Sequence, residues 1–226
     1  MQYPAAVATT TSVKVQPAPD PSDGEPGRRE RKKQATRRGL ADAALRLFDQ
    51  QGFDTTTVEQ IADVVDVSAR TFHRYFERKE DVLFADHAER IAKFRALLAE
   101  RPDDEAPLQS VRLALLMSTR ELDSRADLEF IRARLITQSP PLRAYNLRYL
   151  DDWARAIADH VALRTNSEPT DPWPSLAGRC TMAAVIDARQ RWVTEGGDSA
   201  RRVRLVRAGL DLLVRFGTEF APEKSR

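Results

Sequence analysis

The stretch TTVEQIADVVDVSARTFHRYFERKEDVLF, residues 56–84, decides the fold of this chain. Apolar side chains recur at helical spacing in its first part, and a second short helical segment follows. Thr56 and Glu59 have the spacing of a capping box, which predicts a helix that begins at Thr57. Asp66 stands where the chain must turn, and aspartate tolerates a left-handed backbone better than most residues. The stretch therefore predicts a helix-turn-helix, whose second helix lies in the major groove of DNA.

The second helix of this stretch presents two different faces. Ser68 occupies the position of an N-cap, and Val67 and Phe72 have the spacing of a hydrophobic staple. Phe72 and Phe76 lie on one face, which we expect to pack into a core. The opposite face offers its side chains to a partner, and they are Arg70, Thr71, His73, Arg74 and Tyr75.

In sequence, this stretch resembles the helix-turn-helix of the TetR family of one-component bacterial regulators. The family pattern T-V-x-x-I-A-x-x-x-G-V-S-x-x-T-F-Y-x-Y-F-x-x-K-E-x-L is matched at Thr57, Val58, Ile61, Ala62, Val67, Ser68, Thr71, Phe72, Tyr75, Phe76, Lys79 and Glu80. The chain departs from the pattern at three positions, where it carries Asp66, His73 and Arg78. These departures leave the motif intact and concern its individual DNA contacts.

The resemblance and the chemistry of the exposed face together give a set of candidate DNA contacts. Arg70 and Arg74 are four residues apart, and arginine reads guanine through paired hydrogen bonds in the major groove. The resemblance implies that Tyr75 and Lys79 touch phosphate, which adds affinity with little sequence preference. The full set is Arg28, Arg29, Lys32, Thr56, Thr57, Ser68, Arg70, Thr71, His73, Arg74, Tyr75 and Lys79.

Basic charge is concentrated before the motif. The whole chain carries a formal net charge of only +2, but residues 28–38 hold seven basic side chains and one acidic side chain. We expect Arg28 to Lys33 to precede the first helix and to be unstructured without DNA. Such arms reach phosphates or a narrow minor groove. The alternative is that this run of charge is a solvated surface.

Hydrophobic periodicity predicts an all-α chain of about nine helices. Residues 1–27 are poor in apolar side chains and rich in proline, which predicts a disordered tail. Residues 28–80 form the predicted DNA-binding domain, a three-helix bundle, and residues 81–220 form a larger helical domain for effector binding and dimerisation. One helix is expected from about Lys79 to Glu100, and five more over 107–122, 126–138, 140–164, 173–195 and 199–218.

Composition argues against several functional classes. The single cysteine, Cys180, rules out an internal disulfide and fits a reducing cytoplasm, and we expect its thiol to be buried. No apolar run is long enough to span a membrane, and the first residues lack a secretion signal. The three histidines have no metal-ligand spacing, and we expect no cofactor. Paired carboxylates with a histidine and a nucleophile elbow are also missing, so we do not expect an enzyme.

The second domain resembles known regulators as well. Residues 127–164 are similar to the C-terminal domain of actinobacterial TetR members, including the mycofactocin-cluster regulators. The resemblance implies that central helices enclose an effector cavity and that the effector is a long apolar molecule such as an acyl-CoA. The candidate ligand-binding residues are Met117, Arg120, Tyr149, Trp153, His160, Cys180 and Trp192. The alternative is that these side chains fill the core.

The sequence thus predicts a TetR-type regulator, a repressor that binds palindromic operator DNA as a homodimer. Two DNA-reading heads held about 34–36 Å apart read successive major grooves. The resemblance places the dimer interface in the last two helices. A ligand that binds one of two states more tightly then releases the DNA by shifting their populations. Two alternatives stay open, a constitutive DNA-binding regulator without an effector and a helical enzyme.

Overall fold

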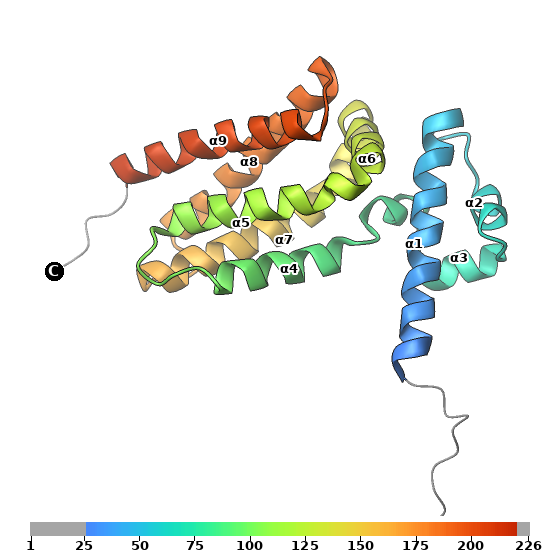
Figure 1. The fold of residues 1–226 in the computed structure, drawn as a ribbon, viewed down its shortest axis with the longest axis horizontal. Helices are drawn as coiled ribbons and strands as arrows, with labels where there is room; N and C mark the ends of the chain where they lie inside the picture. Colours follow the sequence, from blue (N-terminus) through green and yellow to red (C-terminus); the bar gives the residue numbers. More distant parts are fainter. Residues whose placement is uncertain (1–25, 221–226) are drawn as a thin grey trace, which may run out of the picture. The chain divides into compact units, whose positions relative to one another are not determined.

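Helices make up all the regular secondary structure of the described residues. The computed structural model describes the backbone of residues 26–220, in which nine α-helices and two 3₁₀ helices occur and no strand (Figure 1). This confirms the predicted all-α fold class. The predicted tail at residues 1–27 lies outside the described residues, except for Pro26 and Gly27. The side chains that are not described within the range are those of Pro26, Arg28, Glu121, Asp123 and residues 218–220.

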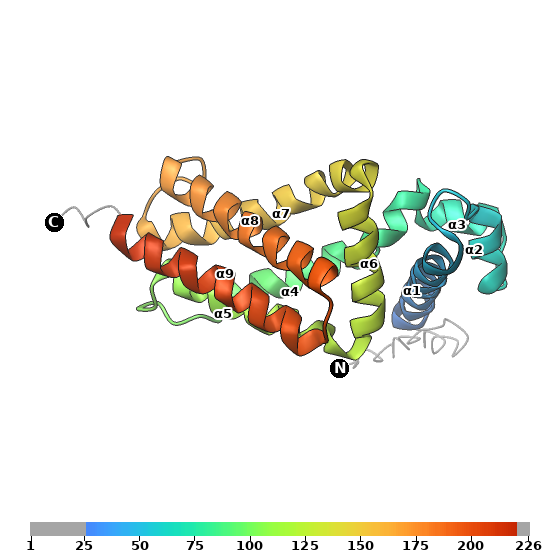
Figure 2. The ribbon, with the colours of Figure 1, turned by 90° about the horizontal axis from the view of Figure 1, so that it is seen from above.

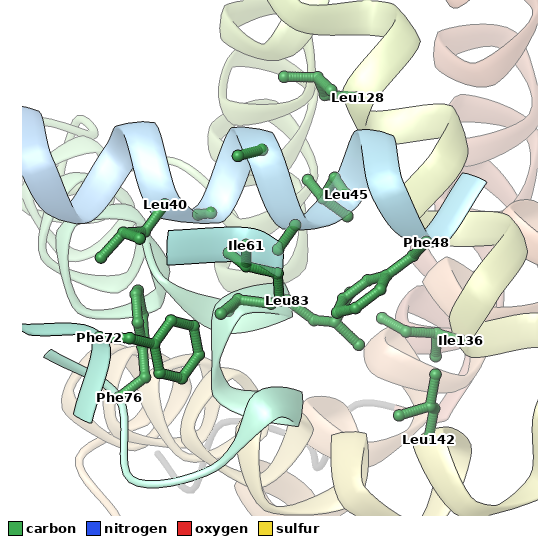
Figure 3. Close-up of a cluster of buried hydrophobic side chains, with 14 residues drawn as sticks. Leu40, Leu45, Phe48, Ile61, Phe72, Phe76, Leu83, Leu128, Ile136 and Leu142 are labelled. Atoms are coloured by element: carbon green, nitrogen blue, oxygen red, sulfur yellow. The ribbon is translucent and has the colours of Figure 1, made fainter. Parts of the chain in front are cut away.

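The first helices form a small bundle around an aromatic core. They are α1 (Pro26–Gln51), α2 (Val58–Val64), α3 (Ala69–Tyr75) and the 3₁₀ helix η1 (Lys79–Phe84). Among the described residues, 26–35 belong to one compact unit and 36–220 to another, so each is described by itself. The core of the bundle lies in the second unit and is formed by Leu40, Leu45, Phe48, Ile61, Phe72, Phe76 and Leu83 (Figure 3).

Six further α-helices form the rest of the second unit. They are α4 (His87–Ala99), α5 (Pro107–Glu121), α6 (Ala126–Gln138), α7 (Pro140–Thr165), α8 (Pro172–Glu195) and α9 (Ser199–Phe220). The 3₁₀ helix η2 (Leu122–Arg125) joins α5 to α6. Helix α8 packs against both α7 and α9, and α9 also lies along α5 (Figure 2).

A close approach of α7 and α8 holds this larger group of helices together. A Cβ atom at Gly178 of α8 would lie 2.2 Å from the backbone oxygen of Ala154 in α7. Only glycine permits this distance between the two backbones. The core beside it is apolar and includes the fully buried side chains of Phe94, Val111 and Ile157.

Several local signals in the sequence are confirmed. Asp66 adopts a left-handed backbone with a φ of 54°, and the Ser68 side chain accepts a hydrogen bond from the Thr71 amide at 3.1 Å. Ser139 caps α7 in the same way, with Pro140 in the first turn. These residues act on their nearest neighbours in the chain, so their roles follow from local sequence alone.

The predicted single helix from Lys79 to Glu100 is wrong. The chain instead forms η1, breaks at Ala85 and Asp86, and begins α4 at His87. Leu83 is buried in the core of the small bundle, whereas Phe94 is buried in the core of the larger group. A single straight helix could not place Leu83 and Phe94 in two separate cores. The break at Ala85 and Asp86 lets η1 pack into the core of the small bundle and α4 into the core of the larger group.

The predicted start of α2 is displaced by one residue. The helix begins at Val58, and Thr57 is its N-cap. The Gln60 amide donates to the Thr57 hydroxyl at 3.3 Å, and the Gln60 side chain accepts from the Thr57 amide at 2.9 Å. The capping box is therefore formed by Thr57 and Gln60 rather than by Thr56 and Glu59.

Candidate functional site

Helix α3 has a buried aromatic face and an exposed basic face. Phe72 and Phe76 are almost completely buried, and their rings lie 5.4 Å apart. On the other side of the helix, the side chains of Arg70, His73 and Arg74 are exposed. The arrangement matches the two faces expected from the sequence, and it presents two guanidinium groups on one short helix.

The remaining candidate contacts near α3 differ in exposure. Thr57 and Ser68 are exposed, whereas Thr71 and Tyr75 are partly buried. Thr56 is a correction to the predicted set, because its side chain is only 1% exposed. Its hydroxyl donates to the Gly52 carbonyl at 2.7 Å and accepts from the Gln51 amide at 3.2 Å. Thr56 therefore joins the end of α1 to the start of α2 and does not offer its side chain to DNA.

Lys79 is partly buried and is held by two backbone carbonyls. Its ammonium group donates to the carbonyl of Phe53 at 2.6 Å and to the carbonyl of Thr56 at 2.8 Å. The same nitrogen lies 4.3 Å from the centre of the Phe53 ring. These contacts fix the loop between α1 and α2, a role that the sequence pattern did not indicate.

The basic residues before the motif are helical. Helix α1 begins at Pro26, so the prediction that Arg28 to Lys33 precede the first helix is wrong. Arg29 and Lys32 are exposed on this helix, and the side chain of Arg28 lies outside the described residues. Six residues between 28 and 38 besides Arg28 are basic, and arginine and lysine have high helix propensity, which explains the extension.

A cavity of about 180 Å³ lies among the helices of the larger group. Its wall is formed by residues of η1, α4, α5, η2, α6, α7, α8 and α9. Apolar and aromatic side chains dominate the wall, among them Phe84, Leu115, Ile136, Leu150, Met182 and Val206. A concave, mainly apolar space with a few polar groups is typical of a small-molecule site.

The structure brings three of the seven predicted ligand residues to this cavity. Tyr149, Trp153 and Trp192 line it. The other four, Met117, Arg120, His160 and Cys180, do not form part of the wall.

Those four lie elsewhere for identifiable reasons. Met117 is 44% exposed and Arg120 is also exposed, because they lie on the outer face of α5. The prediction that the Cys180 thiol is buried is wrong, since Cys180 is exposed on α8. His160 is buried away from the cavity, where burial and the neighbouring Arg164 lower its pKa.

Charged side chains form a compact cluster in the cavity wall. The Arg132 guanidinium lies 3.0 Å from Glu129 and 3.2 Å from Asp86, and Arg90 lies 3.6 Å from Glu129. Burial alone would raise the pKa of Asp86, but the positive charges of Arg132 and Arg90 outweigh it and hold that pKa below its ordinary value. Arg132 is only 7% exposed, so this cluster is a buried charge network between α4 and α6.

A second polar cluster connects the cavity wall to η1. The Asp81 carboxylate accepts from the Tyr145 hydroxyl at 2.6 Å and from Arg148 at 2.8 Å. Arg148 also donates to the hydroxyl of Tyr149 at 2.7 Å, and the Tyr149 ring stacks on Phe84 at 3.8 Å. Tyr149 and Phe84 both line the cavity. One tyrosine therefore contacts both the cavity and the segment that follows the helix-turn-helix.

Helix α6 lies between the cavity and α1. One of its faces supplies Glu129, Arg132, Ala133 and Ile136 to the cavity wall. Leu128 and Ile136 also belong to the core that contains Leu45 and Phe48 of α1 (Figure 3). Two ion pairs flank this apolar contact, Arg125 with Asp42 and Arg134 with Asp49. We call this contact the α1–α6 seam.

Other types of site are not found in the described part of the chain. Among residues 26–220, no three side chains of histidine, cysteine, aspartate or glutamate gather as a metal site would require. None of the helices there has the length and apolar character needed to cross a membrane.

Comparison with known proteins identifies both parts of the chain. Residues 40–85 match the family of bacterial regulatory proteins called tetR, and residues 105–216 match the MftR C-terminal domain. A mycofactocin biosynthesis transcriptional regulator, MftR, of Mycobacterium tuberculosis is 27% identical over 81% of this chain and 95% of its own length. The regulator TcmR of Streptomyces glaucescens is 36% identical over 65% of this chain and 67% of its own.

A solved structure has a similar arrangement of helices. It is the FadR transcriptional repressor of Thermus thermophilus, a TetR-family protein in complex with lauroyl-CoA. It covers 79% of this chain and 93% of its own chain, with a TM-score of 0.53 and 25% sequence identity.

The Asp86 carboxylate gives a testable pH dependence of stability. Since its pKa is lower in the folded than in the unfolded protein, it stabilises the fold above about pH 4 and loses that effect as the pH falls further. We expect Asp86→Asn to lower the free energy of unfolding at pH 7 by about 1–3 kcal/mol. The difference from the parent should shrink near pH 3, as measured by urea denaturation.

Asp103→Asn is the matched control. Asp103 is also paired with an arginine, Arg164, but its side chain is fully exposed. Its substitution should leave the stability nearly unchanged. Equal effects of the two substitutions at pH 7 would contradict the assigned role of the buried cluster.

Proposed function

This chain belongs to the TetR family of bacterial transcriptional regulators, and on that premise we propose that it is a repressor that binds palindromic operator DNA as a homodimer and is released by a small ligand. Members of this family are transcriptional regulators, not enzymes. We propose that the protein acts in the cytoplasm, where its DNA is found. The observation that carries the proposal is the exposed basic face of α3 opposite its buried aromatic face.

In this proposal α3 is the recognition helix. Arg70 and Arg74 are exposed and lie one helical turn apart, so both reach the same groove. We assign them to base edges, and we assign Thr57, Ser68, Thr71, His73 and Tyr75 to phosphates or to the groove wall. Arg28, Arg29 and Lys32 at the start of α1 add charge that favours any DNA sequence. Lys79 supports the head by holding the loop before α2.

We place the dimer interface on α8 and α9. Large apolar side chains on these helices are exposed in the single chain, with Leu176 and Leu212 at 55% and Phe216 at 56%. Cys180 and Ala183 are exposed on α8 as well. An exposed apolar surface of this kind marks an interaction site, and two identical chains cover it most simply by a two-fold axis.

We assign the effector to the cavity and propose that it acts through the α1–α6 seam. A ligand that changes the position of α6 by its contacts with Arg132 or Ile136 also changes the packing against Leu45 and Phe48. The size of such a response is limited by the difference in affinity of the ligand for the two states. The mainly apolar wall supports an apolar effector, and an acyl-CoA is a candidate because the similar Thermus thermophilus repressor was solved with lauroyl-CoA.

The DNA-binding proposal is tested by selection and substitution. Selecting duplexes from a random pool with the purified protein supplies an operator, which should be palindromic. Arg70→Ala and Arg74→Ala should each weaken operator binding by about 1–3 kcal/mol, with a smaller effect on random duplexes. Arg155→Ala is the control, because Arg155 is an exposed arginine on α7, and it should bind operator as the parent does.

Two outcomes separate the proposal from its rivals. Equal losses on operator and random duplexes for both substitutions would remove α3 from the role of reading bases. A palindromic operator whose binding no small molecule weakens would favour a constitutive regulator.

The dimer proposal is tested by placing charge on the exposed apolar surface. Phe216→Glu should convert the protein from dimer to monomer in light scattering coupled to size-exclusion chromatography, because burying two carboxylates in an apolar interface is strongly unfavourable. Leu163→Glu is the control, since Leu163 on α7 is 79% exposed and outside the proposed interface. A Phe216→Glu protein that stays dimeric would place the interface elsewhere.

A further inference from the structure

The cavity contains an arginine without a partner. Arg189 of α8 lines the cavity, and its Nε atom is buried without a hydrogen bond. Across the described residues, no carboxylate forms an ion pair with this guanidinium. A buried positive charge that lacks a counter-ion is unfavourable, so a protein seldom keeps one without a use.

The other arginines of the cavity are accounted for. Arg90 and Arg132 share the two carboxylates of Asp86 and Glu129, so that cluster holds two positive and two negative charges. Arg202 donates to the Thr119 carbonyl at 2.8 Å and lies 5.2 Å from the centre of the Trp192 ring. Within the described part of the chain, Arg189 thus differs from Arg90 and Arg132 in having no carboxylate beside it, and from Arg202 in having neither a carbonyl acceptor nor an aromatic ring beneath its guanidinium.

Burial affects the Arg189 side chain but does not remove its charge. Desolvation lowers its pKa to about 10, which leaves the guanidinium protonated at neutral pH. An anion that enters the cavity therefore meets a positive charge in surroundings of low polarity, where an ion pair is strong.

Two neutral polar groups of the wall also have unused hydrogen-bonding capacity. The Ser118 hydroxyl of α5 is buried without a partner. Asn146 of α7 is 5% exposed, and its amide forms no hydrogen bond to another described residue. Both side chains line the cavity together with Arg189. A positive charge with additional hydrogen-bonding groups is the set that a carboxylate requires.

The size of the cavity limits the ligand. A cavity of about 150 Å³ in another protein binds one benzene molecule, and this cavity measures about 180 Å³. The wall includes the rings of Tyr149, Trp153 and Trp192. The space suits one aromatic ring or a short chain, and it is too small to enclose a coenzyme A group.

We propose that the effector is a compact carboxylic acid whose apolar body lies against these rings and whose carboxylate pairs with Arg189. This inference deepens the proposed effector response and rests on it for the identity of the cavity as the effector site. It replaces the uncharged thioester of an acyl-CoA with a free acid. A thioester carbonyl offers no negative charge to Arg189, whereas a carboxylate neutralises it.

The test compares each acid with its uncharged amide, which has nearly the same shape, and with its much larger coenzyme A thioester. 3-Phenylpropanoate and octanoate are each titrated into the purified protein alongside the corresponding amide and coenzyme A thioester. Binding is followed by isothermal titration calorimetry and by tryptophan fluorescence, since Trp153 and Trp192 line the cavity. We expect at least one acid to bind about 10- to 100-fold more tightly than its amide and its thioester.

Two variants test whether Arg189 causes the difference in affinity between the acid and its amide. Arg189→Met keeps an unbranched apolar side chain and removes the charge, so it should lower the affinity for the acid to that of the amide. Its melting temperature should be no lower than that of the parent, because the substitution removes a buried unpaired charge. Arg191→Met is the control on the same helix, since Arg191 is exposed and paired with Asp187, and it should bind the acid as the parent does.

The outcomes are separate from those of the proposed function. If neither acid binds, if acid and amide bind equally, or if Arg189→Met binds the acid unchanged, the inference is overturned. A coenzyme A thioester that binds more tightly than its acid would also overturn it while supporting the acyl-CoA effector. Tight acid binding that leaves operator affinity unchanged would support the pairing of a carboxylate with Arg189 and contradict its role as the effector.

Discussion

The α1–α6 seam is the contact on which the rest of the structure depends. Leu128 and Ile136 of α6 share one buried core with Leu45 and Phe48 of α1, and ion pairs flank it. Ile136 also lines the cavity, together with Glu129, Arg132 and Ala133 of the same helix. A helix that contacts both the cavity and α1 transmits a displacement from one to the other, because close-packed side chains leave little room for independent movement.

Two polar networks join the cavity to the DNA-reading head by other routes. Asp86 at the start of α4 pairs with Arg132 of α6, while Asp81 of η1 receives hydrogen bonds from Tyr145 and Arg148. Both aspartates lie in the short segment that follows the helix-turn-helix. In the proposed response, a ligand in the cavity would contact groups that belong to both connections, so the coupling would not depend on α6 alone.

The features that were predicted best from the sequence are those that depend on neighbouring residues in the chain, such as helix caps and turns. Ser68 caps a helix and Asp66 takes a left-handed backbone because of their immediate surroundings. The cavity depends instead on how distant helices meet. Between Val111 and Met117 every residue of α5 but Arg112 is apolar, so periodicity did not show that Met117 faces outward. Cys180 of α8 was also misplaced, because its small-residue neighbours suggested burial. Nothing in the sequence indicated that Arg189 lines the cavity, because arginines are normally exposed and only the packing of distant helices buries this one.

The most direct test of the account is the reciprocity between ligand and operator. The affinity for 3-phenylpropanoate is measured by calorimetry for the free protein and for the protein saturated with its selected operator. The account predicts weaker ligand binding in the operator complex, by about 5- to 150-fold, and the ligand must weaken operator binding by the same factor. Equal ligand affinity in the two states would contradict coupling between the cavity and the DNA-reading head.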